Sequence, residues 1–154
     1  MPTRHDQPDR TPDRIGSRPT WLISRAFALS SAMLSAGFDQ HGDGLRGHHY
    51  RLLAALEQRG PASQADLGRS TGIDRSDVTA ALTELEARNL IERRSDPRNK
   101  RRNIVTITAD GINELTALDQ VVDKIQDDLL APLTQAQRDQ FTELLARILE
   151  PTDG

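Results

Sequence analysis

The chain has 154 residues, of which 28% are charged and 3% are aromatic, and its formal net charge is −3. Because it contains no cysteine, disulfides, thiolate metal sites, cysteine nucleophiles and thiol-based redox sensing are excluded. Few aromatic residues beside many Leu, Ala and Ile favour a mainly α fold with an aliphatic interior, and one globular unit is the default for this length.

The amino terminus does not resemble a secretory signal, because residues 1–19 contain no apolar core. We also expect no apolar run of membrane-spanning length. Together these expectations predict a cytoplasmic protein with no membrane partner.

Residues 1–18 are rich in Pro, Arg and Asp, which predicts a flexible arm. From about Thr20 to Phe38, apolar residues recur at helical spacing in two stripes: Leu22, Ala26, Leu29, Met33 and Ala36, and then Ile23, Phe27, Leu34 and Phe38. A helix with two apolar stripes must be covered twice, so we interpret it as part of a dimer interface. The alternative is the central helix of a monomeric bundle.

Three helices are predicted to follow a glycine-rich loop. The first runs from about His48 to Gln58, with Leu45, His49, Leu52 and Leu56 inward. The second is short, begins at a Ser63–Asp66 capping box and ends at Gly72. The third runs from Asp74 to about Arg88 and buries Val78, Ala81, Leu82 and Leu85.

The third of these helices has an exposed face of small, hydrogen-bonding residues near its amino end: Arg75, Ser76, Thr79, Ala80 and Thr83. A helix that enters a DNA major groove about 12 Å wide needs little bulk and donors near its amino terminus. This face therefore predicts contact with DNA bases.

A hairpin is predicted next, from strands at Leu90–Arg94 and Ile104–Thr108 joined by a long polar loop, Ser95–Asn103. Residues 88–102 contain seven basic and two acidic side chains, whereas residues 109–154 contain three basic and ten acidic ones. Such segregation concentrates attraction for phosphate on one surface of an acidic body. We interpret the hairpin as a basic wing.

Two more helices are predicted at the carboxyl end, from about Ala109 to Ala131 and after a Thr134–Gln137 capping box. Their inward residues are expected to be Leu115, Leu118, Val122, Ile125 and Leu129, and then Phe141, Leu144, Leu145, Ile148 and Leu149. With the first helix they can form a bundle, which buries more apolar surface if a second subunit joins it.

The order of elements from Asp74 to Gly111 resembles the MarR family of winged helix-turn-helix transcriptional regulators, and the resemblance covers nearly all of the chain after Pro19. The family's wing and following strand are matched at Asp96, Pro97, Arg101, Thr108 and Gly111. Three positions depart from the pattern: Asn99 replaces an Asp thought to brace the wing, Lys100 an Arg, and Ile107 a Leu. Lys100 keeps the charge but lacks the planar guanidinium that suits a narrow minor groove.

The resemblance implies a homodimer that binds double-stranded DNA at a pseudo-palindromic operator, usually as a repressor. It divides the chain into an arm (1–18), a helical dimerisation region (19–44 and 109–154) and a winged helix-turn-helix domain (45–108). The predicted DNA-contacting residues are Ser63, Gln64, Arg75, Ser76, Thr79, Thr83, Arg98, Lys100 and Arg101.

Many members of the family release DNA when a small aromatic or phenolic acid binds between the dimerisation helices and the winged domain. The candidates for binding such an effector here are Trp21, Arg25, His48, His49 and Tyr50. Alternatively, Trp21 anchors the dimer, Arg25 is solvated and His49 is a satisfied core histidine. A metal site from His41, His48 and His49 is disfavoured, because adjacent histidines on a helix point about 100° apart, and no cofactor is expected.

No glycine-rich phosphate loop, spaced carboxylate pair or nucleophile with a base partner is recognisable, so an enzyme is not expected. The competing function is a winged-helix module that binds proteins and not DNA. Such an adaptor has no need of seven basic residues within residues 88–102.

Overall fold

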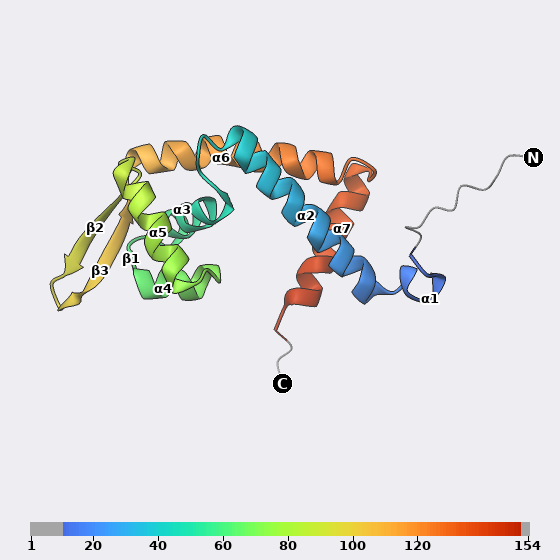
Figure 1. Cartoon of the computed structure of the whole chain (residues 1–154), viewed down its shortest axis with the longest axis horizontal. Coiled ribbons are helices and arrows are strands. Elements are labelled where there is room, and N and C mark those ends of the chain that lie inside the picture. Colours follow the sequence, from blue (N-terminus) through green and yellow to red (C-terminus); the bar gives the residue numbers. More distant parts are fainter. Residues whose placement is uncertain (1–10, 152–154) are drawn as a thin grey trace, which may run out of the picture.

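The computed structural model describes residues 11–151 as an elongated, mainly helical chain with one small sheet (Figure 1). Helix α6, Ala109–Leu129, extends along most of its length. The sheet and its helices lie at one end and α7, Gln135–Leu149, at the other. Residues 1–10 of the predicted arm lie outside the described residues, and α1, Asp13–Gly16, is a one-turn helix within its remainder. The predicted fold class is confirmed.

Helix α2, Pro19–His41, crosses α6 and packs on it at close range. A side chain at Gly37 would collide with Ile125 of α6, so this glycine allows the close crossing. By length and composition α2 could cross a bilayer, so the expectation that the chain has no such run is wrong. The same properties occur in core helices of soluble proteins.

The core lies around α3, Gly47–Arg59, α4, Gln64–Thr71, and α5, Arg75–Ala87. Its fully buried members are mainly leucines, as the predicted helix faces required: Leu45, Leu52, Leu53, Leu56, Leu67, Leu82 and Leu85. Phe38 of α2 and Leu115 and Leu118 of α6 belong to the same buried cluster. We call α3, α4, α5 and the three strands the winged lobe. It therefore shares its core with the two long helices, α2 and α6.

The sheet has three antiparallel strands in the order β1-β3-β2: β1 is Ala62–Ser63, β2 is Ile91–Asp96 and β3 is Asn99–Ile107. The predicted two-stranded ribbon was therefore incomplete, because a two-residue strand has no periodicity to detect. The predicted long loop is also wrong. Pairing continues from Ile91 with Ile107 to Asp96 with Asn99, with a register shift after Ser95, and only Pro97 and Arg98 lie between the strands.

Thr108 is the N-cap of helix α6, and its hydroxyl accepts from the Gly111 amide at 3.0 Å. At the far end, Arg138 Nη1 donates to Asp127 Oδ1 at 2.9 Å and holds the turn between α6 and α7. The expectation that the apolar face of α7 points inward is not met within one chain. Its large side chains are 38–81% exposed: Phe141, Leu144, Ile148 and Leu149.

Candidate nucleic-acid interface

Helices α4 and α5 form the helix-turn-helix. The Ser63 hydroxyl caps α4 by accepting from the Asp66 amide at 3.1 Å. Gly72 ends α4 with φ of 68°, a left-handed conformation that glycine adopts without strain. Asp74 stands at the N-cap of α5 but makes no side-chain capping bond, although aspartate commonly caps helices.

The outer face of α5 is exposed, and it is the small polar face that the sequence predicted. Val78, Ala81, Leu82 and Leu85 are buried on the opposite side. The Thr79 hydroxyl donates to the carbonyl of Arg75 at 3.0 Å, which leaves its oxygen lone pairs as acceptors. Arg75 and Ser76 are exposed beside it at the amino end of the helix.

Thr83 has a different role from the rest of that face. Its hydroxyl donates to the carbonyl of Thr79 at 2.9 Å and accepts from Arg93 Nη2 at 3.3 Å. Arg93 also binds both carboxylate oxygens of Glu86, at 3.1 and 3.2 Å, and this pairing holds the pKa of Glu86 below its ordinary value. Thr83 thus helps to fix β2 against α5, and Arg93 is a neutralised structural cation.

Two side chains shape the wing tip by accepting bonds from nearby amides. Asp96 Oδ1 accepts from the Arg98 amide at 2.9 Å, and Asn99 Oδ1 accepts from the Arg101 amide at 3.1 Å. Asx turns of this kind fix a tight loop locally. Asn99 therefore braces the tip through the backbone, although it cannot form the ion pair of an aspartate.

The basic side chains between residues 88 and 102 fall into two groups. Arg93, Arg94 and Arg102 pair with carboxylates, and Arg88 donates to the Asp43 carbonyl. Within residues 11–151, the three predicted wing cations form no ion pair, and all three are exposed: Arg98, Lys100 and Arg101. The positive charge at the wing tip is therefore uncompensated.

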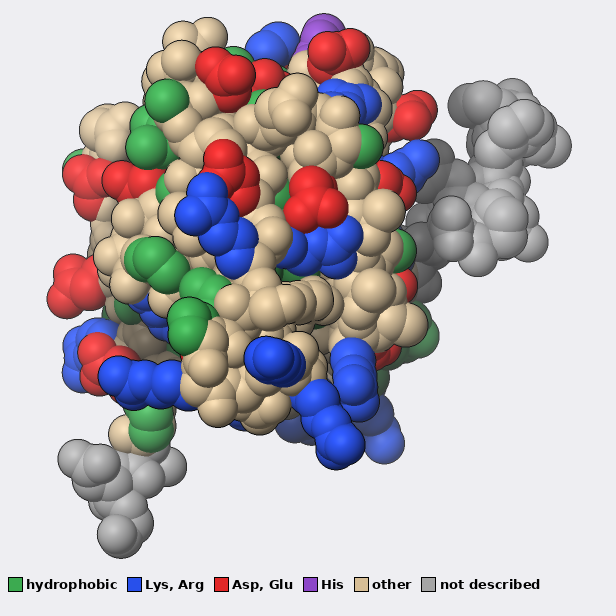
Figure 2. Space-filling view, turned by 90° about the vertical axis from the view of Figure 1, so that its left-hand side faces the viewer, with side chains coloured by type: hydrophobic (Ala, Val, Ile, Leu, Met, Phe, Trp, Pro, Cys, Tyr) green, Lys and Arg blue, Asp and Glu red, His purple; other side chains and the backbone are tan. Residues whose placement is uncertain are grey.

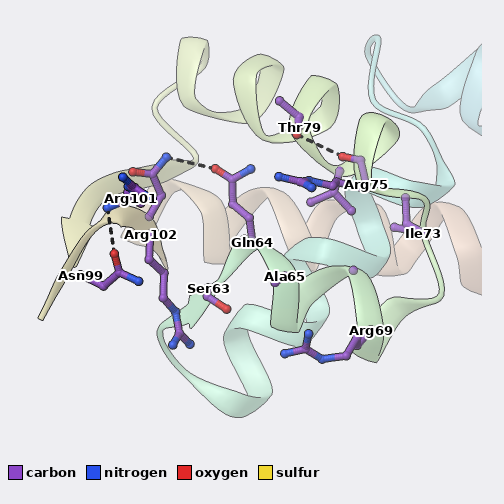
Figure 3. A pocket seen from close by; sticks show the side chains of 13 residues that line it. Ser63, Gln64, Ala65, Arg69, Ile73, Arg75, Thr79, Asn99, Arg101 and Arg102 are labelled. Carbon is purple, nitrogen blue, oxygen red and sulfur yellow. Dashed lines mark hydrogen bonds between the residues drawn. The ribbon is translucent and has the colours of Figure 1, made fainter.

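A concave surface of about 770 Å³ lies between α4, the start of α5 and the wing (Figure 3). We call it the α4–wing groove. Five of its lining residues were predicted from the sequence: Ser63, Gln64, Arg75, Thr79 and Arg101. Four polar lining residues were missed: Arg69, Asn99, Arg102 and Asn103. Arg69 and Arg102 line one groove because the fold places β3 beside α4, and the pairing of Arg102 with Asp66 joins residues that are far apart in the sequence.

Ser63 and Gln64 are less available for contact with DNA phosphate than the sequence suggested. Ser63 is 2% exposed, and its hydroxyl donates to Asp66 Oδ2 at 2.8 Å. Gln64 Oε1 accepts from Asn103 Nδ2 at 3.3 Å, while its own side-chain NH₂ points into the groove (Figure 3). A phosphate contact by the Ser63 side chain is therefore disfavoured, whereas Gln64 still has donors to offer.

The face that carries the wing and the helix-turn-helix is electrostatically divided (Figure 2). Lys and Arg side chains gather along its lower part, whereas most carboxylates lie higher up, among further Lys and Arg side chains. A surface with this division attracts a polyanion to one side of the molecule. The arrangement has the features of a protein surface that binds double-stranded nucleic acid: a slim polar helix, flanking cations and a groove between them.

Comparison with known proteins supports the same conclusion. Residues 43–102 match a model of the MarR family. The chain is 32% identical over 129 residues to the HTH-type regulator YxaD of Bacillus subtilis, covering 84% of this chain and 86% of that protein. The chain belongs to the MarR family. It is a DNA-binding transcriptional regulator.

Two further proteins are similar to this chain over nearly its whole length. The HTH-type transcriptional repressor NicR of Pseudomonas putida is 26% identical over 148 residues, covering 95% of this chain and 91% of NicR. A structure of BpsR from Bordetella bronchiseptica matches with a TM-score of 0.74 at 24% identity, covering 92% of this chain and all of that one. NicR and YxaD are named as transcriptional regulators, which does not favour the protein-binding adaptor, and the likeness to BpsR supports the fold.

The five predicted effector residues of this MarR-family chain do not meet within one protomer. Tyr50 contacts Phe38 near the end of α2, with ring centroids 6.1 Å apart. Trp21 lies seventeen positions earlier on the same helix, about 25 Å along its axis. Trp21 and Arg25 are therefore remote from His48, His49 and Tyr50 in a single chain.

His49 fits the description of a satisfied core histidine. It is 1% exposed, its Nδ1 accepts from the Arg46 amide at 2.9 Å, and its Nε2 lies 2.6 Å from Glu84 Oε2. These bonds require the neutral ring to carry its proton on Nε2. His49 is thus committed to holding α3 against α5. No group of three side chains suited to a metal ion occurs in residues 11–151.

Proposed function

We propose that this regulator binds a pseudo-palindromic operator as a homodimer, with α5 in the major groove and the wing against the adjacent backbone. The observation that carries the proposal is that the polar face of α5 and the wing line the same groove. The exposed polar residues of α5, Arg75 and Thr79, line the same α4–wing groove as Arg101 of the wing. Ser76, Arg98 and Lys100 extend this surface beyond the groove.

The two groups of contacts divide the work. Arg75, Ser76 and Thr79 face outward from a slim helix, so they are the candidates for reading base edges. Arg98, Lys100 and Arg101 are uncompensated charges on a narrow hairpin, so they supply sequence-independent attraction to phosphate. Gln64 adds a donor at the start of α4, whereas Ser63 and Thr83 support the structure beneath.

The dimer is proposed from the apolar surface that one chain leaves uncovered. The exposed large side chains on α2 are Leu22, Ile23, Phe27 and Leu29, at 46–72%, and those on α7 are 38–81% exposed. Monomeric soluble proteins rarely expose so many large apolar side chains together. A second copy of the chain would cover both helices, which supports the dimer-interface interpretation over the monomeric bundle.

We further propose that the regulator represses transcription and that a small aromatic acid lowers its affinity for DNA. NicR is a named repressor, and the DNA binding of BpsR is regulated by 6-hydroxynicotinic acid. Because Trp21 and Arg25 are remote from Tyr50 in one chain, the proposed site would be completed by the partner's α2. Its apolar walls and cations suit an aromatic carboxylate. A DNA-binding regulator of this kind would work in the cytoplasm.

The test is a footprint of the purified protein on the DNA upstream of its own gene and on a genomic fragment library. We expect two protected half-sites about 10 bp apart, one for each recognition helix of a dimer. Addition of a panel of aromatic carboxylic acids should release the DNA for at least one compound. Failure to protect any fragment at low salt would overturn the operator proposal, and release by none of the acids would overturn the effector proposal.

A further inference from the structure

The rim of the α4–wing groove contains an acidic residue that holds two of its cations. Asp66 Oδ2 accepts from Arg102 Nη2 of β3 at 3.1 Å, and Asp66 Oδ1 accepts from Arg69 Nη2 of α4. Both arginines line the groove, and their guanidinium groups converge from the wing and from α4 (Figure 3). One carboxylate thus spans two cations on the proposed DNA-facing surface.

These pairs are exposed, which distinguishes them from the pairing of Arg93 with Glu86. The side chains of Arg69 and Arg102 are 73% and 49% exposed, whereas that of Arg93 is 18% exposed and also bound to Thr83. Ion pairs between exposed side chains contribute little to stability, because water and salt screen them. Arg69 and Arg102 can therefore leave Asp66 at small cost, and a DNA phosphate is the stronger competitor for a guanidinium.

The capping of α4 does not depend on the charge of Asp66. The bond that caps the helix runs from the Asp66 backbone amide to the Ser63 hydroxyl. The Ser63 hydroxyl also donates to the carboxylate at 2.8 Å, and that bond, ahead of the two arginines, holds the pKa of Asp66 below its ordinary value. The carboxylate is therefore charged at neutral pH, and an amide in its place could still accept from Ser63.

We propose that Asp66 competes with DNA phosphate for Arg69 and Arg102, and so limits the sequence-independent part of DNA binding. This inference rests on the proposed function, because it requires the α4–wing groove to face DNA. Each arginine that Asp66 holds is one that must be released before it neutralises a phosphate. The carboxylate itself also repels the DNA backbone. A regulator that searches a genome gains specificity when its attraction to random sequence is restrained.

The experiment measures binding to a random-sequence duplex by fluorescence anisotropy over a range of NaCl concentrations. The variants are Asp66→Asn, the pair Arg69→Gln with Arg102→Gln, and the three changes together. Asp77→Asn is the matched control, because Asp77 is exposed in the first turn of α5 and forms no ion pair within residues 11–151. Thermal unfolding verifies that each variant is folded.

We expect Asp66→Asn to bind random DNA about threefold to tenfold more tightly, as follows from removing one charge a few ångströms from phosphates in water. The slope of log affinity against log salt should steepen by about one to two units as two arginines become free. Asp77→Asn should steepen the slope much less. In the background that lacks both arginines, Asp66→Asn should leave the slope unchanged.

Three outcomes would overturn the inference, and they are distinguishable. If the double arginine variant binds random DNA with wild-type affinity and slope, the groove does not face DNA, and the proposed function fails along with the inference. If that variant is weakened but Asp66→Asn binds no more tightly than wild type, the groove faces DNA and the competition by Asp66 is refuted. An equal steepening with and without the arginines would also refute it, since a general charge effect would then suffice.

Discussion

The hydroxyl of Tyr50 on α3 donates to Asp119 Oδ1 on α6 at 2.6 Å. The same ring packs against Phe38 of α2. One side chain of the winged lobe therefore touches both long helices, so a shift between the lobe and these helices must disturb it. Tyr50 is thus placed to report any relative motion of the two parts.

The bond to Asp119 raises the pKa of Tyr50 from 10.0 to about 12. Because the folded pKa lies above the unfolded one, the stabilisation by Tyr50 is complete below pH 10 and is lost as the pH rises through about 12. Tyr50 is the sole tyrosine of the chain, so its ionisation can be followed by ultraviolet absorbance. We expect the midpoint to fall toward 10.0 in Asp119→Asn. A wild-type midpoint near 10.0 while the helical circular dichroism persists would contradict the bond.

Because His49 is buried as a neutral ring, we expect the protein to lose stability at acid pH. Burial is the main cause that lowers the pKa of His49 below 6.5, with repulsion from His48 and Arg88 adding to it, and it outweighs the opposing bond to Glu84. Stability from the neutral ring is therefore present above pH 6.5 and is lost as the pH falls through the lowered folded pKa. Urea unfolding from about pH 8 to about pH 5 should show the free energy of unfolding declining on the acid side.

His48→Gln is the matched change for this prediction, because it removes a neighbouring charge and keeps His49. The pKa of the His49 ring, followed by NMR, should then rise toward its ordinary value. If His49 in the wild-type protein titrates at or above 6.5, burial does not control it and the acid sensitivity must come from other groups.

The cations of the wing should increase affinity for DNA of any base sequence. Changing Lys100 and Arg101 together to Ala should weaken binding to all duplexes and make the salt slope shallower by up to about two units, because two phosphate neutralisers are lost. Titrations at several NaCl concentrations measure the slope. Arg147→Ala, which removes an exposed cation near the end of α7, should leave the slope unchanged. A wild-type slope in the wing variant would remove the wing from the DNA contact.

Thr79 should act on sequence preference instead. Thr79→Val keeps the side-chain shape and removes the hydroxyl oxygen, so we expect about 0.5–1.5 kcal/mol less discrimination against the wrong base at one operator position, the value of a single hydrogen bond. Competition binding with operator variants measures the change. Thr116→Val is the matched control on α6, since Thr116 makes the same kind of bond, to the Ile112 carbonyl at 3.1 Å. Equal effects of the two changes would show that Thr79 reads no base.

The exposed apolar face of α2 should determine the oligomeric state. Sedimentation of the wild-type protein should give about twice the chain mass of 17.1 kDa. Phe27 is 72% exposed in one chain, and Phe27→Asp should produce the single-chain mass, because a buried unpaired carboxylate is costly in an apolar interface. Ile112→Asp, at an apolar position that is 45% exposed in the first turn of α6, directly after β3, should remain dimeric. A monomeric wild-type protein would overturn the proposed interface.

Helical periodicity and capping residues predicted the helices well, because both are local. The buried face of α5 and the capping box at Thr134 are where the sequence placed them. The charge division was also visible in advance, since it follows from composition. The sequence further indicated which side of α5 would face outward, because Val78 and Leu82 must be buried.

Other features depended on contacts between distant residues, which no local pattern encodes. The two-residue strand β1 exists because Val105 and Ile104 of β3 offer it a partner. The wing is a nearly closed hairpin and not a long loop, because β2 and β3 stay paired from Ile91 with Ile107 to Asp96 with Asn99.

The sequence by itself therefore determined the kind of molecule, a mainly helical winged regulator with a basic hairpin, since helical periodicity, capping and composition are properties of neighbouring residues. The tertiary structure decided which cations are free. Arg93 and Arg102 have the same charge as Arg101, but folding places each of the first two beside a carboxylate more than five positions away. Whether a basic residue attracts phosphate depends on what it already touches, and that is settled only when the wing packs against α4 and α5.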